Sequence, residues 1–437
     1  MKNSQRRLSA PLLLLCAGTA SLAGAEAQLT LGSTLTLGLP TDGLQVAIAD
    51  ATNDGVADLL VRVGSPGASL RVSERDTSGA QDFFESRTIY SSTYEWSLIG
   101  VSDVSGAGHA GIATTGYIGD SADVYYTRLT SELQSVDAHT HVLDSHSVVL
   151  STELVDFDGD GDTELFSVRS SYVTIQDINS ENTEVVTTEL WSSTDAPGPF
   201  TIQRGSTGDF NNDGRVDVLL LDADAHLWRV YTQSVDGTLA EGPTFAAPVY
   251  VDDIALTDLN ADGIDDLMVM QSSNIAVSVS SSPGVYTSLL SVSTPESVDD
   301  TFIAADMNSD GRADIVTRSD TAVYVRLQAP NGTYASPHVF ELGAALTGFT
   351  VGDLLGSPNP EIACSFDGSV EGATGSAIVL LFDAPCPADV SNDSEVNSTD
   401  LAVLLANWGG NDPDFDGSGV VDAGDLAVIL AAWGACQ

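Results

Sequence analysis

An acidic pattern of nine residues recurs along the chain and carries the side chains best suited to bind a hard cation. In GDFNNDGRVDVLLL, residues 208–221, side-chain oxygens are offered by Asp209, Asn211, Asp213 and Asp217, at positions 1, 3, 5 and 9 of the pattern. Glycine at position 6 permits a sharp turn, and position 7 can supply a backbone carbonyl. Calcium prefers oxygen ligands at about 2.3–2.6 Å in loops of this kind. The pattern therefore predicts a calcium site, whereas a merely solvated acidic turn would not explain its recurrence.

The pattern returns at intervals that predict a repeated structural unit. Its first residue is Asp50, Asp103, Asp156, Asp209, Asp258, Asp306 and Asp353. The successive intervals are 53, 53, 53, 49, 48 and 47 residues. A fixed period of this size signals repeated supersecondary units.

Most copies keep the whole ligand set. We predict calcium at five of them, with the ligands Asp50, Thr52, Asp54 and Asp58; Asp156, Asp158, Asp160 and Glu164; Asp209, Asn211, Asp213 and Asp217; Asp258, Asn260, Asp262 and Asp266; and Asp306, Asn308, Asp310 and Asp314. The copy that begins at Asp103 has Ala107 and Gly111 in place of acids, and the copy at Asp353 has Leu355 and Ser357. These two loops are expected to be empty.

The elements around the acidic loops are predicted to be strands. Each period has a β-prone segment before the loop, another after it and two more before the next loop, and four strands of about five to six residues fill such a period. This is the size of a propeller blade. We predict a mainly β fold, a seven-bladed β-propeller over residues 28–384, in which residues 28–38 complete the last blade. Closure would remove the exposed edges of an open solenoid, which is the alternative.

These loops and strands together resemble a known family. The motif D-x-[ND]-x-D-G-x-x-D followed by a β-prone segment is similar to the FG-GAP/VCBS repeat of integrin-α-like propellers. The resemblance implies calcium ions that stiffen the loops on one rim of the disc. At 100 times its dissociation constant, calcium at one such site would stabilise the fold by about 2.7 kcal/mol. Such propellers occur in adhesion proteins, lectin-like binders and some polysaccharide-acting enzymes, so the fold alone does not decide the function.

A different, shorter repeat fills residues 385–437 and predicts a small all-α calcium-binding domain. Two EF-hand-type loops each lead into an amphipathic helix. Their predicted ligands are Asp389, Ser391, Asp393, Asn397 and Asp400, and Asp414, Asp416, Ser418, Asp422 and Asp425. The pair resembles a type I dockerin, although Ser394 replaces the usual glycine at position 6 of the first loop.

The resemblance to dockerins implies a cohesin-type protein as the partner. The family's partner-binding positions correspond to Ser398, Thr399, Ala423 and Gly424. The two halves differ at these positions, which puts two equivalent binding orientations in doubt.

The N-terminus predicts export. Basic residues, an apolar segment and small residues up to Ala27 are typical of a cleaved signal peptide, here residues 1–27. Glycine, serine and Pro11 interrupt this segment, which disfavours a membrane anchor. In an exported chain, Cys386 and Cys436 are expected to form a disulfide that closes the C-terminal segment and contributes about 4 kcal/mol. Cys364 is expected to be a buried strand residue.

The charge of the chain excludes one class of partner. The sequence has 62 acidic and 15 basic residues, a formal net charge of −47. Nucleic acid and anionic membranes are therefore disfavoured as partners. The apolar fraction of 43% is that of a folded protein.

The sequence leaves the chemistry of the propeller open. His139, His141 and His146 lie near Asp137, a cluster that could hold zinc or transfer protons. An exposed outer strand of the second blade is the favoured interpretation. Catalysis is therefore uncertain and disfavoured, and the leading hypothesis is a secreted, non-catalytic module that binds polysaccharide or a cell-surface protein. The alternatives are a polysaccharide lyase or hydrolase carried on a dockerin, and an architectural unit whose terminal module folds back on the propeller.

Overall fold

The fold is seen in a computed structural model of the chain. It describes residues 29, 31–38, 43–52, 54–64, 69–75, 87–91, 96–102, 111–118, 121–129, 135–141, 149–161, 163–169, 172–178, 185–192, 201–260, 262–282, 285–295, 301–343, 345–356, 359–367, 375–382, 388, 390, 395–410, 413, 415 and 420–435. The predicted signal peptide, Cys386 and Cys436 lie outside these residues.

The strands β1 to β28 form seven four-stranded antiparallel sheets. The first three contain β2 (Gly43–Ala49), β3 (Asp58–Val63), β4 (Ser69–Ser73) and β5 (Arg87–Ser91); β6 (Trp96–Ser102), β7 (Gly111–Ile118), β8 (Ser121–Leu129) and β9 (Ser135–His141); and β10 (Val149–Val155), β11 (Glu164–Arg169), β12 (Tyr172–Ile178) and β13 (Val185–Ser192).

The next three sheets repeat this order. They contain β14 (Ile202–Gly208), β15 (Asp217–Asp222), β16 (Leu227–Gln233) and β17 (Leu239–Ala246); β18 (Asp253–Thr257), β19 (Asp266–Gln271), β20 (Asn274–Ser282) and β21 (Val285–Ser293); and β22 (Ile303–Ala305), β23 (Asp314–Arg318), β24 (Ala322–Arg326) and β25 (His338–Glu341).

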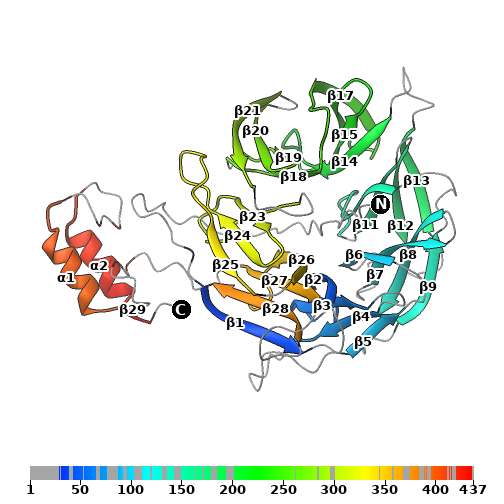
Figure 1. Ribbon diagram of the computed structural model, residues 1–437. Coiled ribbons are helices and arrows are strands. Elements are labelled where there is room, and N and C mark those ends of the chain that lie inside the picture. Colours follow the sequence, from blue (N-terminus) through cyan, green and yellow to red (C-terminus); the bar gives the residue numbers. More distant parts are fainter. Residues whose placement is uncertain are drawn as a thin grey trace.

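The last sheet joins the two ends of the strand assembly. It contains β26 (Ala345–Gly352), β27 (Glu361–Asp367), β28 (Gly375–Phe382) and, as its fourth strand, β1 (Leu31–Gly38). β1 pairs with β28 antiparallel, from Leu31 opposite Phe382 to Gly38 opposite Gly375. Figure 1 shows blue β1 beside orange β28. The prediction that residues 28–38 complete the last sheet is confirmed for the strand that the structure describes.

The first strands of the sheets face the centre and meet one another in chain order. β2 contacts β6, β6 contacts β10, and the series continues through β14, β18, β22 and β26 back to β2. The sheets follow one another around a common centre (Figure 1). The chain therefore folds as a mainly β propeller, and the open solenoid is disfavoured.

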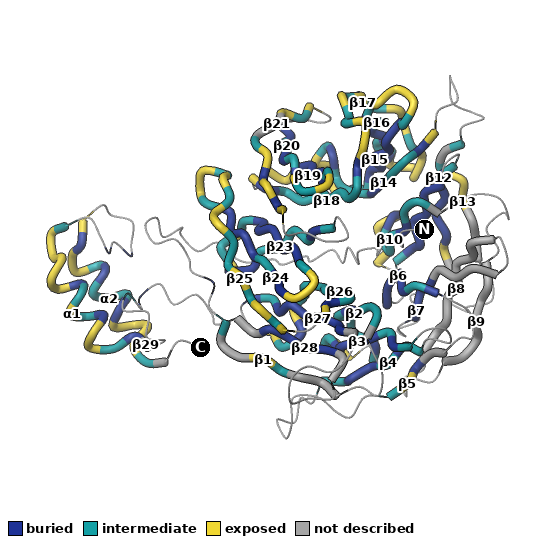
Figure 2. The backbone as a smooth tube through the Cα atoms, viewed as in Figure 1, coloured by how far each residue is buried: buried dark blue, intermediate teal, exposed yellow. Residues whose placement is uncertain are grey.

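Packing of sheet against sheet explains the burial pattern. Every residue of β11, β15 and β23 is buried, because neighbouring sheets cover both faces of a second strand. The outer strand β17 has no buried residue (Figure 2). Cys364 is a free, fully buried cysteine of β27, as predicted, and burial raises the pKa of its thiol to about 12.

The C-terminal part contains two short helices, α1 (Ser398–Ala406) and α2 (Ala423–Ala431), and two short strands, β29 (Glu395–Val396) and β30 (Gly434–Ala435). The helices contact each other, and β29 pairs with β30. Val396, Leu404, Phe415, Val421 and Ile429 belong to one buried cluster. Among the described residues, no helix is long and apolar enough to cross a membrane.

Candidate metal centres

The acidic loops that the structure describes occupy the same place in their sheets. Each described loop connects the first strand to the second, for example β10 to β11 and β14 to β15. Because the first strands run in the same direction around the ring, these loops gather on one rim of the propeller. The predicted order of strand, acidic loop and strand is confirmed for the loops at Asp50, Asp156, Asp209, Asp258, Asp306 and Asp353.

Positions 1 and 6 form the turn of each loop. The position-6 glycines have positive φ in the five loops with complete ligand sets: Gly55 at 84°, Gly161 at 99°, Gly214 at 76°, Gly263 at 83° and Gly311 at 82°. In the loop at Asp209, the Gly214 N–H donates to Asp209 Oδ2 at 2.8 Å. The same contact measures 2.7 to 3.2 Å in the other four loops. The sharp turn that the sequence predicts is present.

The acid at position 9 is buried and holds the start of the loop through a hydrogen bond. It is 0–4% exposed in all six described loops, at Asp58, Glu164, Asp217, Asp266, Asp314 and Glu361. One of its oxygens accepts the N–H of position 2, as Glu164 Oε2 accepts from Phe157 at 2.7 Å. The equivalent contacts measure 2.7 to 3.1 Å in the other five loops.

Glu361 makes this contact in the loop at Asp353, which was expected to be empty because it has Leu355 and Ser357 at positions 3 and 5. The position-9 acid therefore has a structural role that does not depend on a metal. Sequence reasoning assigned it to metal binding alone, because spacing does not reveal which N–H faces the carboxylate.

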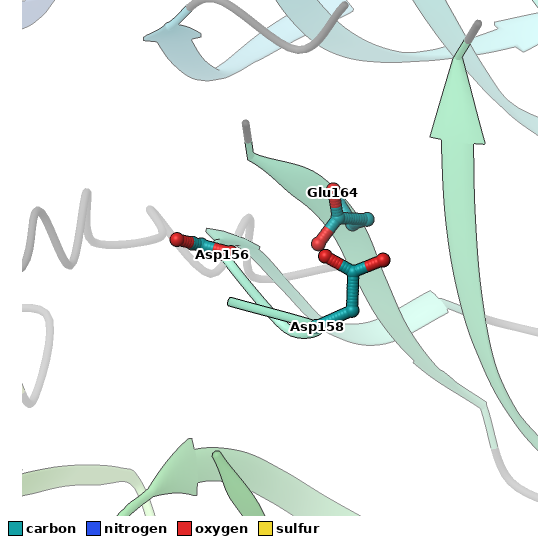
Figure 3. Close-up of side chains that lie close together, drawn as sticks. All are labelled: Asp156, Asp158 and Glu164. Carbon is teal, nitrogen blue, oxygen red and sulfur yellow. The ribbon is translucent and has the colours of Figure 1, made fainter. Parts of the chain in front are cut away.

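The loop at Asp156 brings three carboxylates together. One oxygen atom each from Asp156, Asp158 and Glu164 lies within 4.8 Å of the others. Figure 3 shows Asp158 and Glu164 facing each other, with Glu164 on its strand and the two aspartates on the loop. Three oxygens at this separation could share one calcium ion.

The electrostatics of these carboxylates favour a cation. Burial is the main cause that raises the pKa of Glu164 to about 8, and the charges of Asp158, Asp160 and Asp156 raise it further. The same causes raise the pKa of Asp314 to about 8, and those of Asp58, Asp217 and Asp266 to about 6. Buried carboxylates close to other carboxylates resist ionisation, and a bound cation would remove this penalty.

An unpaired oxygen also fits a cation. Asn211 Oδ1, at predicted position 3, is buried and has no hydrogen-bond partner among the described residues. The equivalent oxygens of Asn260 and Asn308 accept the N–H of Asp262 at 3.0 Å and of Asp310 at 3.3 Å. Because a buried polar atom without a partner is costly, Asn211 Oδ1 is suited to a ligand that the chain itself does not provide.

Two of the loops contain an arginine that the sequence analysis did not consider. The guanidinium Nη2 of Arg215 donates to Asp213, and that of Arg312 donates to Asp310. Each Nε also donates to a backbone carbonyl, of Gln233 at 3.0 Å and of Gln328 at 2.9 Å. These arginines orient the position-5 carboxylates of the loops at Asp209 and Asp306.

In the C-terminal part, four predicted ligands cap the helices. Asn397 and Asp422 are the N-caps of α1 and α2, and Asp400 and Asp425 complete a capping box in each. The predicted partner-binding residues Ser398, Thr399, Ala423 and Gly424 are the first residues of the two helices. The other predicted ligands, Asp389, Ser391, Asp393, Asp414, Asp416 and Ser418, lie outside the described residues.

The predicted outer-strand position is confirmed for two of the clustered histidines. His139 and His141 belong to β9, the outer strand of its sheet. His146 and the loop at Asp103 fall outside the described part of the chain.

Comparisons with known proteins agree with the repeated loops. A model described as "FG-GAP-like repeat" matches residues 156–220, 209–269 and 258–317. The chain therefore contains FG-GAP-like repeats in this part. No curated protein sequence matches the chain.

Solved structures show a similar fold at low identity. The crystal structure of BBS1N in complex with ARL6DN, soaked with lead, has a TM-score of 0.50 at 11% identity and covers 82% of this chain and 98% of that chain. The same complex soaked with mercury has a TM-score of 0.51 at 12% identity and covers 81% and 97%. A lectin of Agrocybe aegerita that recognises non-reducing terminal N-acetylglucosamine has a TM-score of 0.48 at 17% identity and covers 76% and 92%. At these identities the likeness to the first two extends to the fold alone.

Proposed function

We propose that the chain is a secreted, calcium-stiffened propeller that acts as a non-catalytic binding module for polysaccharide or a cell-surface protein. In this proposal a C-terminal dockerin-type domain attaches it to a cohesin-type partner. The observation that carries the proposal is the repeated geometry of the rim loops. The same turn, with the same buried acid behind it, presents oxygen atoms for a cation at regular steps around one rim.

Calcium is the cation that this chemistry favours. All the predicted loop ligands are oxygens, and calcium accepts flexible arrangements of carboxylates, amide oxygens and backbone carbonyls. The converging carboxylates of Asp156, Asp158 and Glu164 and the unpaired Oδ1 of Asn211 both support this choice. A rim stiffened in this way would hold loops in place for recognition with little loss of entropy on binding.

We further propose that the seven sheets are the seven blades of one closed ring. The circle of contacts from β2 through β26 and back to β2 supports this count, as does the pairing of β1 with β28. In a closed ring no sheet leaves its inner strand without a neighbour.

The dockerin-type assignment is supported by the internal symmetry of the C-terminal part. N-caps Asn397 and Asp422 are 25 residues apart (422 minus 397), and so are the capping-box acids Asp400 and Asp425. Two loop-helix units of this kind fit the paired EF-hand-type loops that the sequence predicts. Ser398, Thr399 and Ala423 are exposed at the helix starts and are accessible to a partner.

A binding screen with the full mature chain tests the function. Plant and algal polysaccharides would be offered in calcium and in chelator, and both retention and new reducing or unsaturated chain ends would be scored. Calcium-dependent retention without product is expected. Release of oligosaccharide would contradict the non-catalytic proposal and favour a lyase or hydrolase.

A further inference from the structure

The rim loops at Asp209 and Asp258 contact each other through backbone and side-chain hydrogen bonds. Asp265, at position 8 of the second loop, accepts the N–H of Asp209 on its Oδ2 at 2.9 Å. Its own N–H donates to the carbonyl of Asp209 at 3.0 Å. Asp209 is position 1 of the preceding loop, so a predicted ligand is held at both backbone groups by the next sheet.

A second bond runs between the same two loops. Asn212 Nδ2 donates to the backbone carbonyl of Asp262 at 3.2 Å. Asn212 has φ of 56°, in the left-handed region, which directs its side chain across the junction. The contact therefore joins position 4 of one loop to position 5 of the other.

Two glycines make room for this junction. A Cβ on Gly208 would lie 2.7 Å from Asp265 Oδ2, and a Cβ on Gly263 would lie 2.5 Å from Asn212 Nδ2. A larger residue at either position would displace the facing side chain, Asp265 or Asn212, from the junction. Both sides of the junction are thus shaped for close approach.

The junction depends on position 8 of the acidic pattern, which differs among the seven copies. Position 8 of the pattern is Ala57, Ala110, Thr163, Val216, Asp265, Ala313 or Pro360, so only one loop has an acid there. Thr163 shows the neutral form of the contact, because its hydroxyl donates to Ser102 Oγ of the preceding sheet at 2.8 Å. Asp265 makes the corresponding contact with its carboxylate, which has two oxygens that can accept hydrogen bonds.

We propose that Asp265 and Asn212 couple the loops at Asp209 and Asp258, so that calcium in one raises the affinity of the other. The inference rests on the proposed calcium binding by these loops. A cation in the loop at Asp258 fixes positions 7 and 9, and Asp265 lies between them. Asp265 then holds Asp209 in place before a cation arrives there. Direct repulsion between two Ca²⁺ ions would have the opposite sign, so positive coupling identifies the hydrogen-bonded route.

The test measures hydrogen–deuterium exchange of the full chain, peptide by peptide, across a calcium titration. The Asp262→Ala variant removes a ligand from the loop at Asp258 but keeps the carbonyl that accepts from Asn212. As a single substitution, it should raise the calcium concentration that gives half-maximal protection of residues 208–217. This midpoint should rise by at least about fivefold, which is the lower end of typical coupling. In an Asp265→Ala background, where only the Asn212 bond still joins the two loops, the same change should shift that midpoint much less.

Two further variants separate coupling from damage to the fold. Asn212→Gly keeps a residue suited to positive φ and removes only the side-chain bond, so it should weaken the coupling. Ser309→Gly is the matched control, because Ser309 has the same position and the same φ of 56° but bonds to Asn359 of another junction. Asp265→Asn keeps an oxygen to accept the Asp209 N–H and should retain the coupling.

The outcomes are distinguishable. If Asp262→Ala leaves the midpoint of residues 208–217 unchanged in the wild type, the coupling is refuted while calcium binding stands. If neither loop gains protection at any calcium concentration, the proposed calcium binding is refuted, and the coupling with it.

Discussion

At the scale of the residue, the position-9 carboxylate is expected to change its protonation state if the loop binds the proposed calcium ion. In the loop at Asp156, burial and three nearby carboxylates raise the pKa of Glu164 from 4.5 to about 8. Its Oε2 nevertheless accepts the Phe157 N–H at 2.7 Å, which a protonated acid can also do with its unprotonated oxygen. A bound cation would favour the ionised form.

Without calcium, the protein is expected to lose stability as pH rises from about 5 to about 8. In this window the unfolded chain has released the Glu164 proton while the folded chain still holds it, so folding becomes less favourable as pH rises. Asp314, whose pKa is raised to about 8, acts in the same direction. Urea unfolding in chelator at pH 5 and pH 8 measures the difference.

The variant Glu164→Gln is the control for this pH dependence. It keeps an oxygen to accept the Phe157 N–H but cannot ionise. We expect a shallower loss of stability with pH in chelator, together with a smaller stabilisation by calcium. An unchanged pH dependence in this variant would show that other groups are responsible.

Alanine substitutions at two glycines distinguish the cost of backbone strain from the cost of steric contact at the loop junction. Gly214 and Gly263 both have positive φ, at 76° and 83°, but a Cβ meets nothing within 4 Å at Gly214 and meets Asn212 at Gly263. Alanine at Gly214 should cost about 1–2 kcal/mol of unfolding free energy from the backbone alone. Alanine at Gly263 should cost more.

Chemical denaturation in calcium measures both costs, and the extra cost at Gly263 should vanish in an Asn212→Gly background. Equal costs for the two alanine variants would mean that Asn212 moves away from the new Cβ with no loss of stability.

At the scale of the element, the strands were predictable where their signal was local. The β-prone segments on both sides of each acidic loop are present as strands, and β1 was placed beside the last sheet because the final repeat lacks one strand. Junctions such as Asp265 with Asp209 were not predictable. They join residues 56 positions apart, and only the packing of sheet against sheet brings them together.

Removal of β1 is expected to open the ring. A chain that lacks residues 28–38 leaves β28 as an unpaired edge, which exposes backbone N–H and C=O groups to other chains. We expect a lower melting temperature and self-association, measured by thermal unfolding and size-exclusion chromatography. A chain that lacks only residues 1–27 is the control and should stay monodisperse. If both truncated chains melt and elute alike, β1 does not close the propeller.

At the scale of the whole molecule, the repeated acidic motif made the fold predictable, whereas the function was less predictable. Seven copies of one motif indicate a ring whatever the details of any one loop, because each sheet needs a neighbour on both faces. The sharp turn between positions 1 and 6 of the acidic loops was predictable because the same glycine recurs in each complete copy. The structural role of the position-9 acids and the arginine pairs of Asp213 and Asp310 depended on side-chain packing, which spacing does not encode.

The net charge of −47 is a reason to expect that the rim loops influence the stability of the whole molecule. Like charges repel in the compact state, and each calcium ion of the proposed rim sites would offset two negative charges where carboxylates are crowded. The rim loops should therefore affect the stability of the whole propeller and not only their own order.

The most direct test of calcium binding by the rim loops is a calorimetric titration of the chelator-treated full chain with calcium. We expect saturable binding of about five ions by the propeller loops with complete ligand sets, in addition to any bound by the C-terminal loops. A titration that shows no saturable calcium binding would contradict it.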